Sequence, residues 1–174
     1  MKGMHTIHIT SRRVAYTLEL SRKVSVIKGN SGTGKSSMIR LISDYLELGK
    51  DSGIKIAVSS SAELMVLSNT SDWQNILSAV KNTILFIDED VRYIYTKAFQ
   101  QELWKADCYT VIISRSGRFN GLPFAIGAVY ELATRESGKG TVTEMYQLYE
   151  EKHEKNDFSL FLAEDSNSGW IIVF

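Results

Sequence analysis

The chain has little of several things that mark whole classes of protein. It contains one cysteine, Cys108, one proline, and no apolar run of about 18 residues. A single cysteine excludes an internal disulfide framework and a zinc site built from cysteines. The lack of a long apolar run predicts that no helix crosses a membrane, and the first residues lack the apolar core of a signal peptide. We therefore expect a cytoplasmic protein.

An excess of charge of one sign is also missing, because 20 Lys and Arg residues balance 20 Asp and Glu residues. Hydrophobic residues make up 44% of the 174 residues, which is the composition of a folded chain rather than a disordered one. The charges are unevenly spread, however, since residues 1–40 hold eight basic residues and one acid. This basic end indicates either an anion-binding face or a solvated surface.

The apolar pattern predicts an α/β fold. Alternation of polar and apolar residues over 5–11 and 12–20 predicts an antiparallel hairpin. Four apolar runs separated by helical segments predict parallel strands that are covered on both faces. The expected strands after the hairpin are 24–28, 54–58, 64–67, 83–87, 109–113, 128–132, 142–149 and 159–162; the expected helices are 35–48, 72–80 and 91–104, and residues 135–141 are expected to form a turn-rich break.

The length predicts one domain. We expect residues 1–149 to form a nucleotide-binding domain, and residues 150–174 to be a charged connector and a terminal strand packed on it.

A glycine-rich segment supplies the strongest functional signal. Residues 29–36 fit the phosphate-binding pattern G-x-x-x-x-G-K-[ST], between an apolar strand and an amphipathic helix. The glycines let consecutive N–H groups point inward at an anion, and the start of the helix adds its positive end. The alternative is a turn with an incidental Gly-Lys-Ser. The residues expected to contact phosphate are Gly29, Asn30, Ser31, Gly32, Thr33, Gly34, Lys35, Ser36 and Ser37.

Individual roles follow from the side chains. Lys35 is expected to reach the terminal phosphates and to act in catalysis, and the Ser36 hydroxyl is expected to hold Mg²⁺. The second functional signal is an acidic pair, Asp88-Glu89, directly after the apolar run 84–87. Asp88 is expected to orient Mg²⁺, and Glu89 to activate the attacking water as a general base. The alternative is a solvated acidic turn.

Together these motifs resemble the P-loop NTPases of the additional-strand, catalytic-glutamate class, over about residues 5 to 132. The resemblance implies a P-loop three-layer fold with a mainly parallel central sheet, ATP and Mg²⁺ as cofactors, and ATPase activity. It also implies that strand 109–113 lies between the two motif strands. Ser114 would then take a phosphate-sensing, catalytic position, with Arg115 as a second candidate. A turn cap is the alternative role for Ser114.

The layout is closest to the ABC/SMC-type or OLD-like ATPase heads, because a hairpin runs directly into the phosphate-loop strand. The chain lacks the Leu-Ser-Gly-Gly-Gln-like motif and the switch histidine of those heads. Residues 158–169 faintly resemble the first strand and acidic turn of a Toprim domain. Only ten residues follow Glu164, so a plain terminal strand is favoured over a shortened Toprim remnant.

Three functions remain open from the sequence. The first is a Mg²⁺-dependent ATPase that drives a conformational or assembly change, and the lack of an Asn-Lys-x-Asp motif favours ATP over GTP. The second is a P-loop kinase for a small acceptor, and the third a slow, nucleotide-gated interaction module. A homo-oligomer or partner protein could supply an arginine to the site, and nucleic acid could bind the basic N-terminal face. A plain surface residue is the favoured interpretation for each of the candidate arginines, which are Arg92, Arg115, Arg118 and Arg135.

Overall fold

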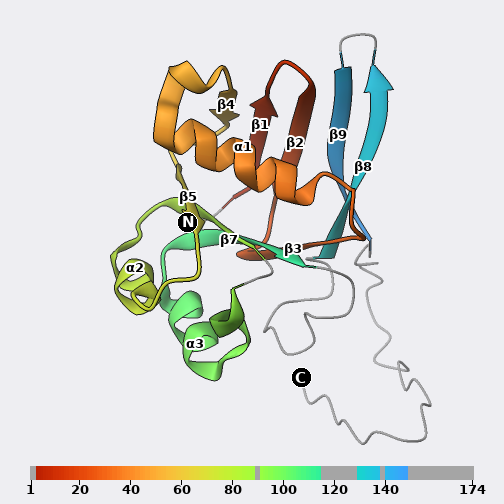
Figure 1. Cartoon of the computed structure of the whole chain (residues 1–174). Coiled ribbons are helices and arrows are strands. Elements are labelled where there is room, and N and C mark those ends of the chain that lie inside the picture. The colour runs from red at the N-terminus through yellow and green to blue at the C-terminus, as the bar shows by residue number, and fades with distance from the viewer. Residues whose placement is uncertain (1–2, 89–90, 115–128, 138–139, 149–174) are drawn as a thin grey trace, which may run out of the picture.

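The computed structural model of the chain describes residues 3–88, 91–114, 129–137 and 140–148 (Figure 1). These residues form one nine-stranded sheet with the order β4-β1-β2-β9-β8-β3-β7-β6-β5. The strands are β1 (His5–Thr10), β2 (Val14–Leu20), β3 (Val24–Lys28), β4 (Lys55–Val58), β5 (Glu63–Leu67), β6 (Thr83–Ile87), β7 (Cys108–Ser114), β8 (Val129–Ser137) and β9 (Gly140–Gln147). The helices are α1 (Lys35–Leu48), α2 (Trp73–Ala79) and α3 (Lys97–Lys105), with short 3₁₀ helices η1 (Gly49–Ser52) and η2 (Arg92–Tyr95).

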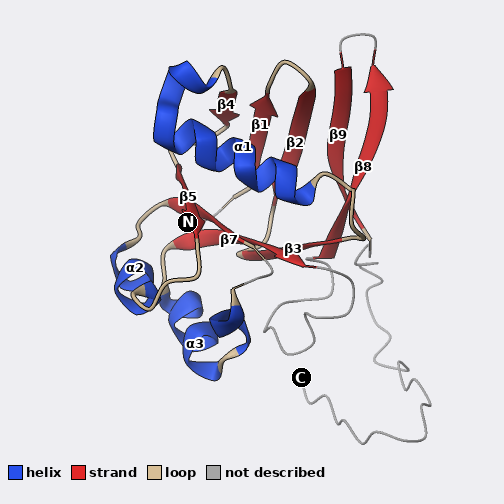
Figure 2. Cartoon of the chain, viewed as in Figure 1, coloured by secondary structure: helices blue, strands red, loops and turns tan. Residues whose placement is uncertain are grey.

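The sheet has a parallel part and a mixed part. Strands β8, β3, β7, β6 and β5 are parallel to their neighbours in that row. Strand β9 is antiparallel to β8 but parallel to β2, and β1 is antiparallel to both β2 and β4. In Figure 2 the strands of the mixed part stand steeply against β3 and β7, so the sheet is curled into a half-barrel.

The expectation of a P-loop three-layer α/β fold with a mainly parallel central sheet is therefore wrong. The structure is a mixed, curled sheet in which three of the eight described strand pairings are antiparallel. The reason lies in two hairpins. The expected N-terminal hairpin is present, but it lies within the sheet, because β1 pairs with β4 on one side and β2 pairs with β9 on the other. Residues 135–141 are no broad break, since β8 and β9 run on to Ser137 and from Gly140.

The apolar runs are strands with a core on each face. Along β6, Ile84 and Phe86 face a cluster that includes Met38 and Ile42 of α1. Leu85 and Ile87 face a second cluster, which holds residues of α2 and α3 such as Trp73 and Phe99. All five residues of β6 are buried. This double burial explains why the sequence shows a continuous apolar run here rather than alternation.

Helix α1 lies inside the curl and packs against β1, β4 and β5. Its bounds agree with the expected helix over 35–48. The expected helix over 91–104 is divided instead, because Thr96 adopts an extended conformation between η2 and α3. The Thr96 hydroxyl accepts the Phe99 N–H at 3.2 Å and so begins a new helix. In the part of the chain that the structure describes, no helix is long and apolar enough to cross a membrane. The expected connector and strand over 150–174 lie outside the described residues.

Candidate phosphate-binding site

The glycine-rich loop connects β3 to α1. Gly32 and Gly34 both have φ of +87°, a conformation that strongly favours glycine. Gly34 is also packed tightly, because a Cβ atom added to it would lie 3.0 Å from the Tyr16 hydroxyl oxygen. A Cβ atom on Gly32 would meet nothing within 4 Å. The backbone conformation thus explains why both positions are glycine. At position 34 the close approach of β2 is a second reason.

Tyr16 of β2 holds the end of this loop. Its hydroxyl donates a hydrogen bond to the carbonyl oxygen of Gly34 at 3.0 Å, and the Met38 N–H donates to the same oxygen at 2.9 Å. The Tyr16 side chain is buried, and this burial raises the pKa of its hydroxyl above the ordinary value of a tyrosine. The hydroxyl therefore keeps its proton at neutral pH and remains a donor. Tyr16 belongs to neither motif, and its only local signal is its position on the inward face of an alternating strand.

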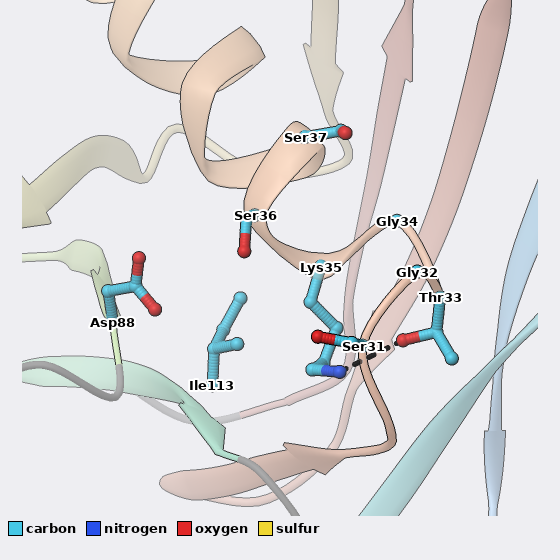
Figure 3. Close-up of a pocket in the computed structure, with 9 residues that line it drawn as sticks. All are labelled: Ser31, Gly32, Thr33, Gly34, Lys35, Ser36, Ser37, Asp88 and Ile113. Atoms are coloured by element: carbon cyan, nitrogen blue, oxygen red, sulfur yellow. Dashed lines mark hydrogen bonds between the residues drawn. The ribbon is translucent and has the colours of Figure 1, made fainter.

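Lys35 is folded back into the loop. Its side chain is only 7% exposed, and its Nζ atom donates to the carbonyl oxygens of Gly29 at 2.6 Å and Asn30 at 2.8 Å. It also donates to Thr33 Oγ1 at 2.9 Å, the contact drawn in Figure 3. The ammonium group is thus held at the loop by these three neutral oxygen atoms. Gly29 and Asn30 position this lysine, and they are not among the residues that line the adjoining cavity.

A cavity of about 170 Å³ lies between the loop, the first turn of α1 and the ends of two strands. Asp88, directly after β6, and Ile113 of β7 form its far side. In Figure 3 the Ser36 hydroxyl and the Asp88 carboxylate lie on facing sides of this cavity, whereas the Ser37 hydroxyl points away from Asp88. The predicted site residues that line it are Ser31, Gly32, Thr33, Gly34, Lys35, Ser36, Ser37 and Asp88.

The oxygen atoms of Ser36 and Asp88 are of the chemical kind that binds a magnesium ion. A hydroxyl from Ser36 and a carboxylate from Asp88 are hard oxygen ligands, and Mg²⁺ is commonly held by one or two protein ligands with phosphate and water oxygens. No group of three or more His, Cys, Asp or Glu side chains that could hold a metal ion occurs among the described residues. A metal here would therefore depend on ligands from a bound phosphate group.

The remaining candidates lie elsewhere. Ser114 ends β7 opposite Lys28 of β3, is 1% exposed and does not line the cavity, although its neighbour Ile113 does. Arg92 is exposed in η2, and Arg135 of β8 forms an ion pair with Glu144 at 3.0 Å. Neither arginine lines the cavity. Glu89, Arg115 and Arg118 lie outside the described residues.

A second cavity, of about 480 Å³, adjoins the first and was not anticipated. The two share Gly32, Thr33, Gly34 and Ser37, so the second begins where the loop meets α1. Its other walls come from β2, β8 and β9, through Val14, Tyr16, Leu132, Thr134, Thr141 and Thr143. The hydroxyl oxygens of Thr134 and Thr143 lie 3.0 Å apart. No local pattern could indicate this cavity, because it depends on β9 lying between β2 and β8.

The sequence matches no protein-family model and no curated protein. The resemblance to ATPase heads therefore depends on the motif residues alone.

Proposed function

We propose that this protein binds ATP with Mg²⁺ at the loop of residues 29–36 and hydrolyses it to drive a conformational or assembly change. One observation carries the proposal: the glycine-rich loop, Lys35, Ser36 and the Asp88 carboxylate from a separate strand surround a single cavity. A glycine-rich turn without function has no need of an acidic side chain, 52 residues after Ser36, on the other side of the same cavity.

The start of α1 supports phosphate binding. The helix has 14 residues, its first turn contains no acidic residue, and its N-cap, Gly34, makes no side-chain capping bond. The positive end of the helix is therefore not neutralised by its own side chains, which favours a bound anion. Phosphate oxygens would also offer Lys35 charged acceptors in place of the carbonyl oxygens of Gly29 and Asn30. The Lys35 ammonium already makes charge-assisted bonds to those carbonyl oxygens, but a phosphate oxygen adds the attraction of a full negative charge. We therefore expect Lys35 to exchange partners on binding.

The second cavity supports a nucleotide rather than a bare phosphate. Its volume of about 480 Å³ lies within the usual range for small-molecule sites, about 300–1,000 Å³. Its apolar walls, Val14 and Leu132, could contact a base or ribose ring, and its threonine hydroxyls could pair with their polar atoms. A triphosphate held at the loop would then have room for its nucleoside next to Ser37.

Hydrolysis of ATP needs chemical groups that take part in the reaction, in addition to those that bind the nucleotide. A magnesium ion at Ser36 and Asp88 would neutralise charge on the phosphates. Within the proposal Glu89 takes the role of general base that its position after Asp88 predicts. Lys35 would stabilise negative charge on the phosphate oxygens as the bond to the leaving group breaks.

Three preparations test the proposal: the wild type, Lys35→Ala and Glu89→Gln, with Lys97→Ala as a matched control at an exposed lysine of α3. Nucleotide affinity is measured by titration of a fluorescent ATP analogue, and hydrolysis by phosphate release at several protein concentrations. We expect Lys35→Ala to lose binding and Glu89→Gln to bind but not hydrolyse. Wild-type affinity in Lys35→Ala would overturn the site.

Unchanged turnover in Glu89→Gln would remove that residue from the mechanism. Turnover that rises more than proportionally with protein concentration would indicate that a second subunit completes the site. Tight ATP binding without turnover in the wild type would favour the nucleotide-gated module, and transfer of phosphate only after an acceptor is added would favour the kinase.

A further inference from the structure

A third cavity, of about 510 Å³, carries three arginines that the proposed function does not use. Arg12 and Arg13 come from the turn between β1 and β2, and Arg40 comes from the second turn of α1. The cavity touches the two cavities described above only through Val14 and Ser37. It therefore lies beside the candidate nucleotide site, but most of the residues that line it are not shared with that site.

The turn is built so that its arginine side chains stay available. The Ser11 hydroxyl accepts the N–H groups of Arg13 at 3.4 Å and Val14 at 3.2 Å, and it donates to the Val14 carbonyl at 3.1 Å. The Thr141 N–H donates to the Arg13 carbonyl at 2.9 Å. The backbone of the turn is thus held by Ser11 and β9. Among the described residues, the guanidinium groups of Arg12, Arg13 and Arg40 take part in no ion pair and no hydrogen bond.

The surrounding charges favour a chain of phosphates over a single anion. Lys55, exposed at the start of β4, pairs in register with Thr10 and so extends the basic rim beyond the cavity. Two acidic side chains, Asp44 and Asp51, also line the cavity and oppose an anion within it. Residues 1–40 contain eight basic residues and one acid, which places the three arginines in the most basic part of the chain. The planar fork of an arginine side chain matches a phosphate oxygen pair in geometry.

We propose that Arg12, Arg13 and Arg40 form a binding site for the phosphodiester backbone of a nucleic acid, separate from the ATP site. The contacts are made to phosphates and not to base edges, so binding is independent of sequence and weakens steeply with salt. The proposal does not require ATP binding or hydrolysis, and it stands or falls on the arginines alone.

Binding of a fluorescent 20-nucleotide strand, as DNA and as RNA, is measured by anisotropy over a range of salt concentrations. The test variant is Arg12→Gln with Arg13→Gln and Arg40→Gln. The control is Lys81→Gln with Arg92→Gln and Lys97→Gln, which removes the same charge from exposed positions before β6 and in η2 and α3. We expect the test variant to lose at least about tenfold in affinity, with the salt slope shallower by about 1 for each arginine removed, and the control to change little.

A third variant, Asp51→Asn, is expected to bind the strand more tightly, because it removes a negative charge from the cavity wall. A gain of affinity cannot arise from a failure to fold. The proposal is overturned if the wild type does not bind the strand, if test and control variants weaken equally, or if Asp51→Asn has no effect. ATP titration of the test variant separates the two sites: loss of ATP affinity with retained strand binding would assign the arginines to the nucleotide instead.

Discussion

The hydroxyl of Tyr16 donates a hydrogen bond to the carbonyl oxygen of Gly34 at 3.0 Å, which ties the second strand of the chain to the residue that precedes α1. The same oxygen accepts the Met38 N–H of the first helical turn. One buried side chain of the mixed part of the sheet therefore holds the point where the glycine-rich loop ends and the helix begins.

Tyr16→Phe removes that hydroxyl and keeps the ring. We expect a loss of about 1 kcal/mol in the free energy of unfolding, the typical net contribution of one hydrogen bond. We also expect weaker ATP binding, because Gly34 is no longer held against β2. Urea unfolding and nucleotide titration measure the two effects. Tyr95→Phe, at an exposed tyrosine for which no hydrogen bond is described, is the matched control. Equal ATP affinity in Tyr16→Phe and the wild type would contradict a positioning role for the hydroxyl.

Gly34→Ala and Gly32→Ala form a second matched pair, because both glycines have φ of +87° but only Gly34 has a close neighbour. Each alanine carries backbone strain of roughly 1–3 kcal/mol. We expect Gly34→Ala to be the more destabilising, since its methyl group meets the Tyr16 hydroxyl oxygen at 3.0 Å. Urea unfolding of both variants isolates the cost of that contact. Equal losses of stability would mean that Tyr16 moves aside without cost.

Asp88→Asn tests the metal contact predicted across the cavity from Ser36. We expect the variant to lose the part of ATP affinity that depends on Mg²⁺, and to bind ATP in the presence of a chelator at least as well as the wild type does. The reason is that the carboxylate favours a nearby cation but repels phosphate oxygens. Titrations with and without Mg²⁺ provide the comparison, with Glu47→Gln on the exposed face of α1 as the control. A Mg²⁺ dependence like that of the wild type would exclude Asp88 from the site.

Because the thiol of Cys108 is buried, we expect the stability of the protein to change at high pH. Burial raises the pKa of its thiol above the ordinary value of 9.0, so the folded protein holds this proton more tightly than the unfolded chain does. The contribution of the neutral thiol to the free energy of unfolding is fully present below pH 9. It is lost as the pH rises towards and through the higher pKa of the folded protein. We expect Cys108→Ala to lose less stability than the wild type between pH 8 and pH 11, as measured by urea unfolding at each pH. Parallel curves for the two proteins would contradict a buried, neutral thiol.

Local patterns predicted the elements well because they reflect burial. The run at 83–87 has the bounds of β6, and the apolar face over 35–48 has the bounds of α1. The expectation that the loop, Lys35 and Asp88 meet depended on the two motifs and on the parallel strands before them, and these residues do line one cavity. The sheet was predicted wrongly, because the parallel pairing of β2 with β9, such as Ala15 with Val142, joins the N-terminal hairpin to the rest of the sheet. No local pattern encodes a partner more than 120 residues away. The second cavity was missed for the same reason, since β2, β8 and β9 all line it. Tyr16 was missed because no motif links it to Gly34, 18 residues further along the chain.

The position of β9 between β2 and β8 also bears on how the chain folds during synthesis. The β1–β2 hairpin can form as soon as its residues leave the ribosome, because its contacts are local. One edge of β2 then stays without a partner until residues 141–144 have been made. Unpaired strand edges promote association with other chains, and pairings between distant residues form slowly. The nascent chain thus carries an open edge from the time β2 is made until more than 120 further residues have followed, and the curled sheet is complete only after β8 and β9 have both been made.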